Sequence, residues 1–462
     1  MKTNPPIIPM LALLALSTLD PQLSTVFAQG SLTPPGPPAP TMLTLNQIEP
    51  RTPISSAPYT ITQEGSYYLT GNIFVAGNTN AITVLASQVT IDLNGFGLFG
   101  ESGVNAAIVV PNPQLNITVR NGTLEYWGVG VQATNASNSS LEKLQCFESL
   151  QSALTIGQNS FVSDCIVQNA AEGGGGNGIQ AGDGSTIMHC TVGNSFNHFS
   201  IGMVVGTSCV IESSTVTSNF IGIITGDSAV LKDCGFLGSS SYGVQAGNGC
   251  TISDCSACNN GFTTLGLAGI STGEGCTIRG CTADRNSEGI NAGLGSTIKE
   301  CTVISNATTG LIAGNGCTIS DCTANDNTNG ILAASECTIA GCTASANNGD
   351  GIQATYSCLI KGNTCSSNSR YAIVGGAGIH VLDSGNRIED NLLNSDQYGI
   401  KADGNENLII RNTVRASGSD NYNIASGNMV DTIVNAAASG VVLGPTGGTS
   451  LGTTDPWANF SF

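Results

Sequence analysis

The sequence is organised around an internal repeat of 20 to 21 residues, marked by recurring Cys-Thr-Ile-x-x-Cys segments. Successive markers such as Cys301, Cys322 and Cys342 stand 21 and 20 residues apart. A second marker, Gly followed by an apolar residue, recurs in parallel, for example as Gly330-Ile331. Self-similarity at a short fixed period is the signature of equivalent coils that stack on one another. The chain is therefore expected to fold as a solenoid.

Each period contains three short segments of alternating small or β-branched residues. In one coil these are Cys317–Ile319, Cys322–Ala324 and Gly330–Ala333, with the turn residues Ser320-Asp321 and Asn325–Asn329 between them. No segment has the length or spacing of a helix. Three strands per coil predict an all-β solenoid with three parallel sheets around a narrow core. The nearest alternative, a leucine-rich repeat, is disfavoured because its Leu and Asn spacing is absent.

The repeats, together with four other stretches, carry a resemblance to a known family. These stretches are Tyr59–Ile73 (YTITQEGSYYLTGNI), Val89–Gly100 (VTIDLNGFGLFG), Ile117–Val131 (ITVRNGTLEYWGVGV) and the closing Asp455–Phe462 (DPWANFSF). Over residues 55–462 the chain resembles secreted bacterial right-handed parallel β-helix repeat proteins of the pectin lyase-like superfamily, in a subfamily without an assigned activity. The resemblance implies a right-handed parallel β-helix. It does not imply one activity, because this fold hosts lyases, hydrolases, epimerases, adhesins and inert tips.

The charge balance excludes several partners. Lys and Arg number 14 against 32 Asp and Glu, which gives a formal net charge of −18. Such a chain is poorly suited to neutralising phosphates, so neither nucleic acid nor an anionic membrane surface is expected as a partner. Aromatic residues make up only 5% of the chain, as expected for a core too narrow for large rings.

The N-terminus has the layout of a secretory signal peptide. Lys2 precedes an apolar run over Ile7–Leu16, and Val26 and Ala28 occupy the positions that a signal peptidase reads. The run is too short to cross a bilayer, and no other apolar stretch approaches the ~20 residues needed, so no membrane span is expected. The mature protein is predicted to be secreted, extracellular or on the cell surface.

The pattern divides the chain into five segments. We expect a signal peptide over residues 1–28, a Pro-rich linker over 29–54, irregular capping coils of the β-helix over 55–150, regular repeats over 151–430 and a C-terminal capping tail over 431–462.

The 17 cysteines fall mostly into two columns of equivalent positions that point into the predicted core. Disulfides within coils would require a pair in every coil, but most coils carry one Cys opposite Ser, Ala or Asn. We favour buried free thiols that act as small apolar fillers, with inter-coil disulfides as the alternative. An array of metal sites is disfavoured because the three His do not recur with the thiols.

A column of Asn stands five residues after the marker. Asn tolerates the left-handed turn conformation, and its amide can bond the same amide one coil away, so a stacked Asn ladder is expected at this corner. The column comprises Asn219, Asn260, Asn286, Asn306, Asn327, Asn347 and Asn368.

Acidic residues gather at the corner just before the marker. Asp233 and Asp254 occupy equivalent positions in adjacent coils, as do Glu300 and Asp321. Carboxylates about one strand spacing apart, ~4.8 Å, repel each other unless a cation or a proton lies between them. These four residues are therefore the candidate ligands for Ca²⁺.

Arg279 and Lys299 flank these carboxylates in the adjacent column. In a polysaccharide lyase, such a base would abstract the proton α to a uronate carboxyl that a metal neutralises. Carboxylates ~5 Å apart also match the separation in retaining glycosidases. Arg279, Lys299 and Glu300 are therefore the candidate catalytic residues. The alternative is that these are exposed corner residues that keep the protein soluble.

Two other charge pairs at this corner have opposite signs. Lys361 neighbours Glu389, and Asp390 neighbours Arg411, in equivalent positions of adjacent coils. They are interpreted as ordinary surface ion pairs that contribute little to stability.

Long coils expand at a different corner, before the Gly-apolar segment. The insertions offer Phe262, Arg370 and Tyr371 as aromatic and basic groups, which are the candidate substrate-binding residues. No nucleophile elbow, zinc-protease motif or P-loop is present. His380, in an alternating segment, is interpreted as an exposed strand residue rather than a base.

Together these patterns predict a secreted β-helix that binds extracellular polysaccharide or a cell-surface glycan on a lateral face. Lyase-like or hydrolase-like processing of the glycan remains an open extension of this function. The competing hypothesis is a non-catalytic structural or adhesive rod at the cell surface.

Overall fold

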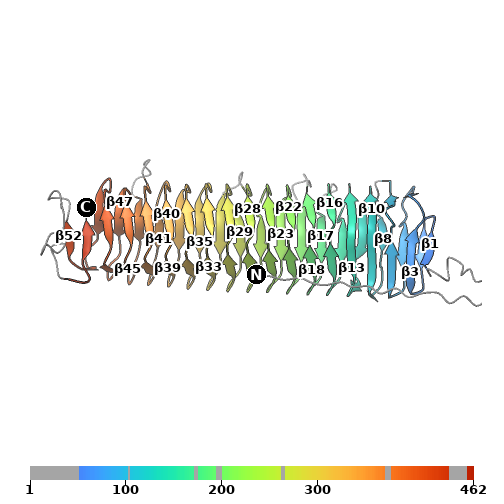
Figure 1. The fold of residues 1–462 in the computed structure, drawn as a ribbon, viewed down its shortest axis with the longest axis horizontal. Coiled ribbons are helices and arrows are strands. Elements are labelled where there is room, and N and C mark those ends of the chain that lie inside the picture. Colours follow the sequence, from blue (N-terminus) through green and yellow to red (C-terminus); the bar gives the residue numbers. More distant parts are fainter. Residues whose placement is uncertain are drawn as a thin grey trace, which may run out of the picture. The chain divides into compact units, whose positions relative to one another are not determined.

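The computed structural model of the protein describes residues 51–101, 103, 105–170, 175–193, 200–261, 266–369, 376–435 and 455–461. Every regular element in these ranges is a β-strand. The strands pair in parallel with equivalent strands of the coils before and after, so the coils stack along one axis (Figure 1). The predicted all-β solenoid of three parallel sheets is confirmed.

One regular coil illustrates the arrangement. It consists of β36 (Thr318–Ser320), β37 (Thr323–Asn325) and β38 (Asn329–Ala333). Ile319 of β36 lies opposite Ile298 of the preceding coil and Ile339 of the following one, and all three are fully buried. Stacks of like side chains therefore build the narrow core.

We name the sheets after this coil: sheet 1 contains β38, sheet 2 contains β36 and sheet 3 contains β37. Sheet 1 carries the Gly-apolar segments. Its strands are β2 (Tyr59–Ile61), β5 (Ile82–Val84), β8 (Ala106–Val109), β11 (Val129–Ala133), β14 (Leu154–Ile156), β17 (Asn177–Ala181), β20 (Ile201–Val205), β23 (Ile221–Thr225), β26 (Val244–Ala246), β29 (Ala268–Thr272), β32 (Glu288–Ala292), β35 (Thr309–Ala313), β38, β41 (Ile352–Ala354), β44 (Ala377–Val381), β47 (Tyr398–Ala402) and β50 (Asp420–Ile424).

Each corner of a regular coil contains one residue in the left-handed backbone region. In the coil of β36 these residues are Asp321 (φ 54°), Asp326 (φ 56°) and Glu336 (φ 62°). Gly, Asn and Asp tolerate this region better than most residues, which explains the composition of the turns. The corner between sheets 2 and 3 therefore has a conformational reason to hold Asp.

The predicted Asn ladder is present from Asn260 to Asn368. At each step the backbone N–H and the side-chain Nδ2 of one Asn both donate to Oδ1 of the next. For Asn306 these bonds to Asn327 are both 2.9 Å long, and Nδ2 also donates to the Ala283 carbonyl at 3.1 Å. Asn219 lies outside the ladder because the equivalent position in the next coil holds Ser239. The Nδ2 of Asn219 donates to the Thr217 carbonyl instead.

Two further ladders, not predicted from the sequence, replace the thiol columns in the last coils. One runs through Asn363, Asn391, Asn412 and Asn459. The other runs through Asn386, Asn407 and Asn428. Asn takes the inward positions held by Cys in the central coils, so polar rows replace apolar fillers towards the C-terminal end.

All 17 cysteines are free thiols; 16 are buried and Cys258 is partly exposed. This confirms the favoured interpretation over inter-coil disulfides. Burial raises the pKa of the Cys146 and Cys365 thiols, which keeps them protonated and unreactive.

At each end of the described solenoid, a further strand pairs in parallel with the terminal coil. At the N-terminal end, β1 (Arg51–Ile54) pairs with β3 (Gly65–Leu69), so the first strand uses the last residues assigned to the Pro-rich linker. At the C-terminal end, β53 (Asn459–Ser461) pairs with β49 (Thr413–Arg415). Nearby, the Trp457 ring stacks on the Arg411 guanidinium at 4.7 Å.

Replacing a central ladder residue should destabilise the solenoid. Asn327→Ala removes the acceptor for both donors of Asn306, and we expect a loss of about 2–4 kcal/mol in the free energy of unfolding. Chemical denaturation followed by circular dichroism measures the loss. Asp326→Asn is the matched control because Asp326 is exposed in the same turn. Equal stability of the two variants would contradict a supporting role for the ladder.

The thiols should differ sharply in reactivity. We expect iodoacetamide to modify Cys258 in the folded protein and the other cysteines only after denaturation, because a buried thiol does not meet the reagent. Mass spectrometry of tryptic peptides gives the order of modification. Uniform labelling of the native protein would refute the burial of the thiol columns.

Candidate functional site

The outer face of sheet 1 presents a column of outward-facing side chains, one from each coil. The strand register aligns Ser271, Asn291, Ile312, Leu332, Gln353, His380 and Lys401 in this order. Parallel strands lie ~4.8 Å apart, so the column offers a contact at regular intervals along the axis. Its composition changes from apolar at Ile312 and Leu332 to charged at His380 and Lys401.

A shallow groove of about 560 Å³ follows part of this column. Ile312, Leu332 and Gln353 line it, together with Leu294 and Leu382 of the neighbouring corner. Leu294 and Leu382 are 46% and 40% exposed. The groove is thus largely apolar, and Leu382 brings it within two residues of His380.

At the end of the column, His380 is bonded on both sides of its ring. Nδ1 lies 2.9 Å from Asp350 Oδ2, and Nε2 lies 2.9 Å from Asp403 Oδ2. Lys401 Nζ donates to the same Asp403 oxygen at 2.9 Å and lies 3.2 Å from His380 Nε2. We refer to Asp350, His380, Lys401 and Asp403 as the His380 cluster.

The charge state of the cluster follows from its partners. Burial acts to lower the pKa of His380, but the hydrogen bond and charge of Asp350, with the hydrogen bond of Asp403, outweigh it and raise the pKa above the ordinary histidine value. Burial acts to raise the pKa of Asp403, but hydrogen bonds from His380 and Lys401 hold it below its usual range. The arrangement favours an imidazolium between two carboxylates.

Asp350 is itself firmly positioned. Its Oδ1 accepts the Ala377 N–H at 2.7 Å, and its Oδ2 accepts the Gln353 side-chain amide at 3.0 Å. A buried carboxylate that is held by two donors and bonds Nδ1 fixes the orientation of the imidazole ring. The other ring nitrogen, Nε2, lies beside the half-exposed Asp403.

The structure corrects the interpretation of His380 as an exposed strand residue. Its side chain does point outward from sheet 1, but Asp350, Lys401 and Asp403 surround it and leave it only 7% exposed. Sequence reasoning missed the cluster because the insertion before β44 hides the register of the coils. Aligning the Gly351, Gly378 and Gly399 markers would have placed Gln353, His380 and Lys401 in one column.

The predicted catalytic residues do meet at the corner between sheets 2 and 3. Arg279 Nε donates to Glu300 Oε2 at 2.8 Å, and Lys299 Nζ lies 3.3 Å from Glu300 Oε1. The hydrogen bonds of Arg279 and Lys299 lower the pKa of Glu300. All three side chains are exposed, and they neutralise one another on a convex corner.

The predicted Ca²⁺ ligands also occupy this corner. Asp233, Asp254, Glu300 and Asp321 all adopt the left-handed conformation, with φ between 52° and 55°. Asp233 lies 3.6 Å from Lys232 Nζ, and Glu300 is bonded to its two cations. In the described part of the chain, no three or more His, Cys, Asp or Glu side chains converge as metal ligands. A Ca²⁺ site here stays a prediction from sequence.

The predicted substrate-binding residues Phe262, Arg370 and Tyr371 lie outside the described residues. In the sequence, their insertions precede β29 and β44.

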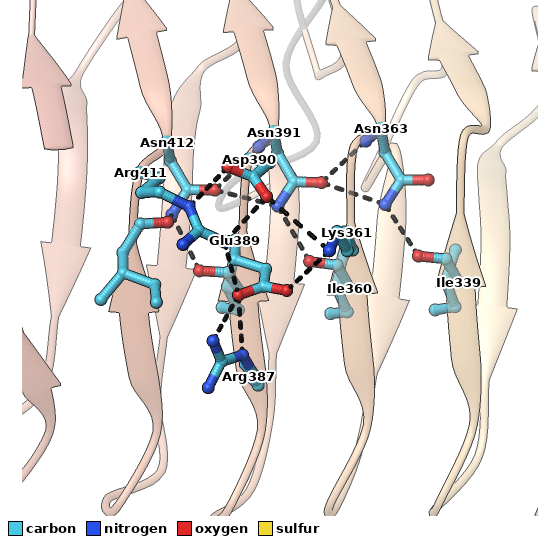
Figure 2. A network of polar contacts seen from close by, with 12 residues as sticks. Ile339, Ile360, Lys361, Asn363, Arg387, Glu389, Asp390, Asn391, Arg411 and Asn412 are labelled. Atoms are coloured by element: carbon cyan, nitrogen blue, oxygen red, sulfur yellow. Dashed lines mark hydrogen bonds and ion pairs between the residues drawn. The ribbon is translucent and has the colours of Figure 1, made fainter. Parts of the chain in front are cut away.

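A second charged network lies at the corner between sheets 2 and 3, near the C-terminal end (Figure 2). Glu389 is only 5% exposed. It lies 3.3 Å from Lys361 Nζ and accepts bonds of 2.7 Å from Arg387 and 3.0 Å from Arg411. Arg411 also donates twice to Asp390, at 2.7 and 2.9 Å. The interpretation as ordinary surface pairs is therefore wrong for Glu389, which is buried under three cations.

This network should make the C-terminal coils sensitive to acid. Burial acts to raise the pKa of Glu389, but hydrogen bonds from Arg387 and Lys361 hold it below its ordinary value. Its contribution is therefore present above the unfolded pKa of ~4.3 and is lost as pH falls through the lower folded pKa. We expect Glu389→Gln to lower the free energy of unfolding at pH 7, because the three cations lose their common carboxylate. The loss should be limited to about 1–2 kcal/mol because these cations are partly exposed to solvent.

Urea denaturation at pH 7 and pH 3 tests this expectation. Glu406→Gln is the control, because Glu406 is an exposed corner residue. The difference between the Glu389 variant and the wild type should shrink at pH 3. A difference that is equal at both pH values would contradict the ionic origin of the effect.

Comparisons with known proteins support the fold. Residues 219–373 and 269–414 match the right handed beta helix region family. No curated protein matches the sequence. The described part of the chain contains no helix of the length and hydropathy needed to cross a membrane. From its strand topology and this match, the chain is a right-handed parallel β-helix protein.

Several solved structures are similar at low identity. The Dettilon tailspike protein gp208 is 14% identical with a TM-score of 0.30, over 72% of this chain and 62% of that one. The Azotobacter vinelandii mannuronan C-5 epimerase AlgE4 A-module is 12% identical with a TM-score of 0.27, over 79% and 90% of the two chains. The periplasmic alginate epimerase AlgG is 12% identical with a TM-score of 0.30, over 80% and 77%. These similarities concern the fold alone.

Proposed function

We propose that the protein is a secreted β-helix that binds an extracellular polysaccharide along the outer face of sheet 1. The observation that carries this proposal is the groove that runs along successive coils towards the His380 cluster. A surface that repeats from coil to coil suits a ligand that repeats from sugar to sugar. Ile312 and Leu332 offer apolar contacts for sugar rings, and Asn291 and Gln353 offer amides for their hydroxyl groups.

The His380 cluster supports a role in processing the bound glycan. Asp350 orients the ring through Nδ1, and Nε2 is the nitrogen that exchanges a proton with a group arriving beside Asp403. A positioned imidazole of this kind acts as a general acid or base. Since its pKa is raised, the proton-donating form persists to higher pH than in an ordinary histidine.

A structural or adhesive rod is the second candidate. It is favoured by the corner between sheets 2 and 3, where Arg279, Lys299 and Glu300 pair with one another on an exposed surface. Three Asn ladders also stiffen the coils without offering a ligand a contact. In this function the outer face of sheet 1 would bind no glycan.

Binding to a panel of uronic and neutral polysaccharides, with and without Ca²⁺, separates the two candidates. We expect Leu332→Asp to weaken binding by roughly tenfold or more, because it places a charge on the apolar floor of the groove. Leu237→Asp is the matched control, since Leu237 is an exposed leucine on sheet 3. If no glycan binds, or if both variants bind equally, the proposed face is wrong.

Turnover of a bound glycan tests the His380 cluster. We expect His380→Gln to lower the rate by about 10²-fold or more while binding is retained, because the variant cannot exchange a proton. His189→Gln serves as the control, since His189 is exposed at a distant corner. A lyase product is detected by ultraviolet absorption and a hydrolase product by its reducing ends. Binding without turnover in the wild type would refute processing and leave a binding protein.

A further inference from the structure

The Asn ladder of the central coils ends on an acid. Asp396 occupies the position after Asn368 and is only 1% exposed. Its Oδ1 accepts both the backbone N–H of Asn368 at 2.8 Å and the side-chain Nδ2 at 2.9 Å. This oxygen therefore does what the Oδ1 of each Asn does in the coils before.

The second carboxyl oxygen takes the place of the amide nitrogen. A Cβ atom added at Gly351 would lie 2.7 Å from Asn368 Nδ2, and one added at the equivalent Gly378 would lie 2.5 Å from Asp396 Oδ2. In the ladder, that nitrogen donates to a strand carbonyl of the preceding coil, as Asn368 Nδ2 does to Ala344 at 3.0 Å. Within the described residues, Asp396 Oδ2 has no hydrogen-bond partner.

A carboxylate cannot supply the missing bond, because it only accepts hydrogen bonds. A protonated carboxyl group has one O–H, and this donor would occupy the place of the amide N–H. The electrostatic surroundings favour the proton: burial raises the pKa of Asp396 to about 7, although the N–H groups of Asn368 and Asn394 act to lower it.

No neighbouring positive charge neutralises an ionised Asp396 in the described part of the chain. Cys365, on β43 (Thr364–Ser366), is a buried thiol whose own pKa burial raises well above the ordinary value. On the adjacent strands of sheet 1, His380 and Lys401 are engaged with Asp350 and Asp403. None of the cations in the described part of the chain is paired with Asp396 in the structure.

We propose that Asp396 is a proton-dependent rung of the Asn ladder. Its Oδ1 accepts the Asn368 bonds in either state, but its Oδ2 donates to the preceding coil, as the ladder amides do, only while the carboxyl group is protonated. The coil of Asp396 contains β47, and it supplies Lys401 and Asp403 to the His380 cluster. Loss of the proton therefore loosens the part of the solenoid that completes this cluster. The inference does not depend on glycan binding.

The direction of the pH effect follows from linkage. A carboxyl group whose folded pKa lies above its unfolded value of ~3.9 binds more protons in the folded state. Its stabilisation is full below about pH 4 and declines as pH rises towards the folded value near 7. The His380 imidazolium adds an effect of the same sign, but only above the unfolded histidine pKa of ~6.5.

Hydrogen exchange of the full chain, measured by mass spectrometry between pH 5 and pH 8, tests the rung. After correction for intrinsic exchange rates, we expect protection of β46 (Leu392–Asn394) and β47 to fall by about tenfold per pH unit between pH 5 and 6.5. Asp396→Asn supplies a permanent N–H donor, so its protection should be independent of pH in this range and at least equal to that of the wild type.

Three further variants make the result decisive. Asp326→Asn changes the exposed acid of the equivalent turn three coils earlier and should keep the wild-type pH dependence. His380→Gln removes the histidine contribution above pH 6.5 and should leave the lower range unchanged. Asp396→Ala cannot form the rung, so its protection should be low at every pH. The inference is overturned if Asp396→Asn retains the wild-type pH dependence or loses protection throughout.

Discussion

The in-register parallel pairing of each coil with the next is the constraint on which the whole structure depends. Because every residue lies beside its equivalent in the adjacent coil, each column of the sequence becomes a row of neighbours in space. Apolar rows such as Ile298, Ile319 and Ile339 pack into a narrow core in which aromatic residues are few. Inward polar residues are retained where they form hydrogen bonds. Ser214 bonds the backbone, and Asn bonds its own kind because its amide is both donor and acceptor.

The same stacking makes repeated charge unfavourable, and the structure handles it in two ways. At Glu300 and Glu389, basic residues from the same and neighbouring coils neutralise the carboxylates. At Asp396, an isolated carboxyl group enters a row of amides and fits it best with a proton bound. The left-handed φ angle of the corner between sheets 2 and 3 also accounts for several acidic residues there, so an acidic column need not signal chemistry.

Much of the fold could be read from the sequence, whereas the candidate site could not. The period, the three strands per coil, the Asn ladder and the free thiols all follow from equivalent positions that recur. The predicted set Arg279, Lys299 and Glu300 does come together, since adjacent columns lie side by side. The sequence pattern misplaces His380 because its partners Asp350 and Asp403 lie in the coils before and after it, and an insertion that breaks the period separates Asp350 from His380.

The sequence alone determined the architecture, because a repeat of 20 to 21 residues admits few ways of burying its apolar positions. It also determined which residues face inward, since strand alternation applies equally to every coil. Only the tertiary structure decided which unique residues meet: the ring of His380 between two carboxylates, Glu389 beneath three cations, and Asp396 at the end of the ladder. These residues do not recur at equivalent positions in the other coils. Their surroundings depend on the lengths of individual coils and on side-chain contacts, which the repeat pattern does not specify.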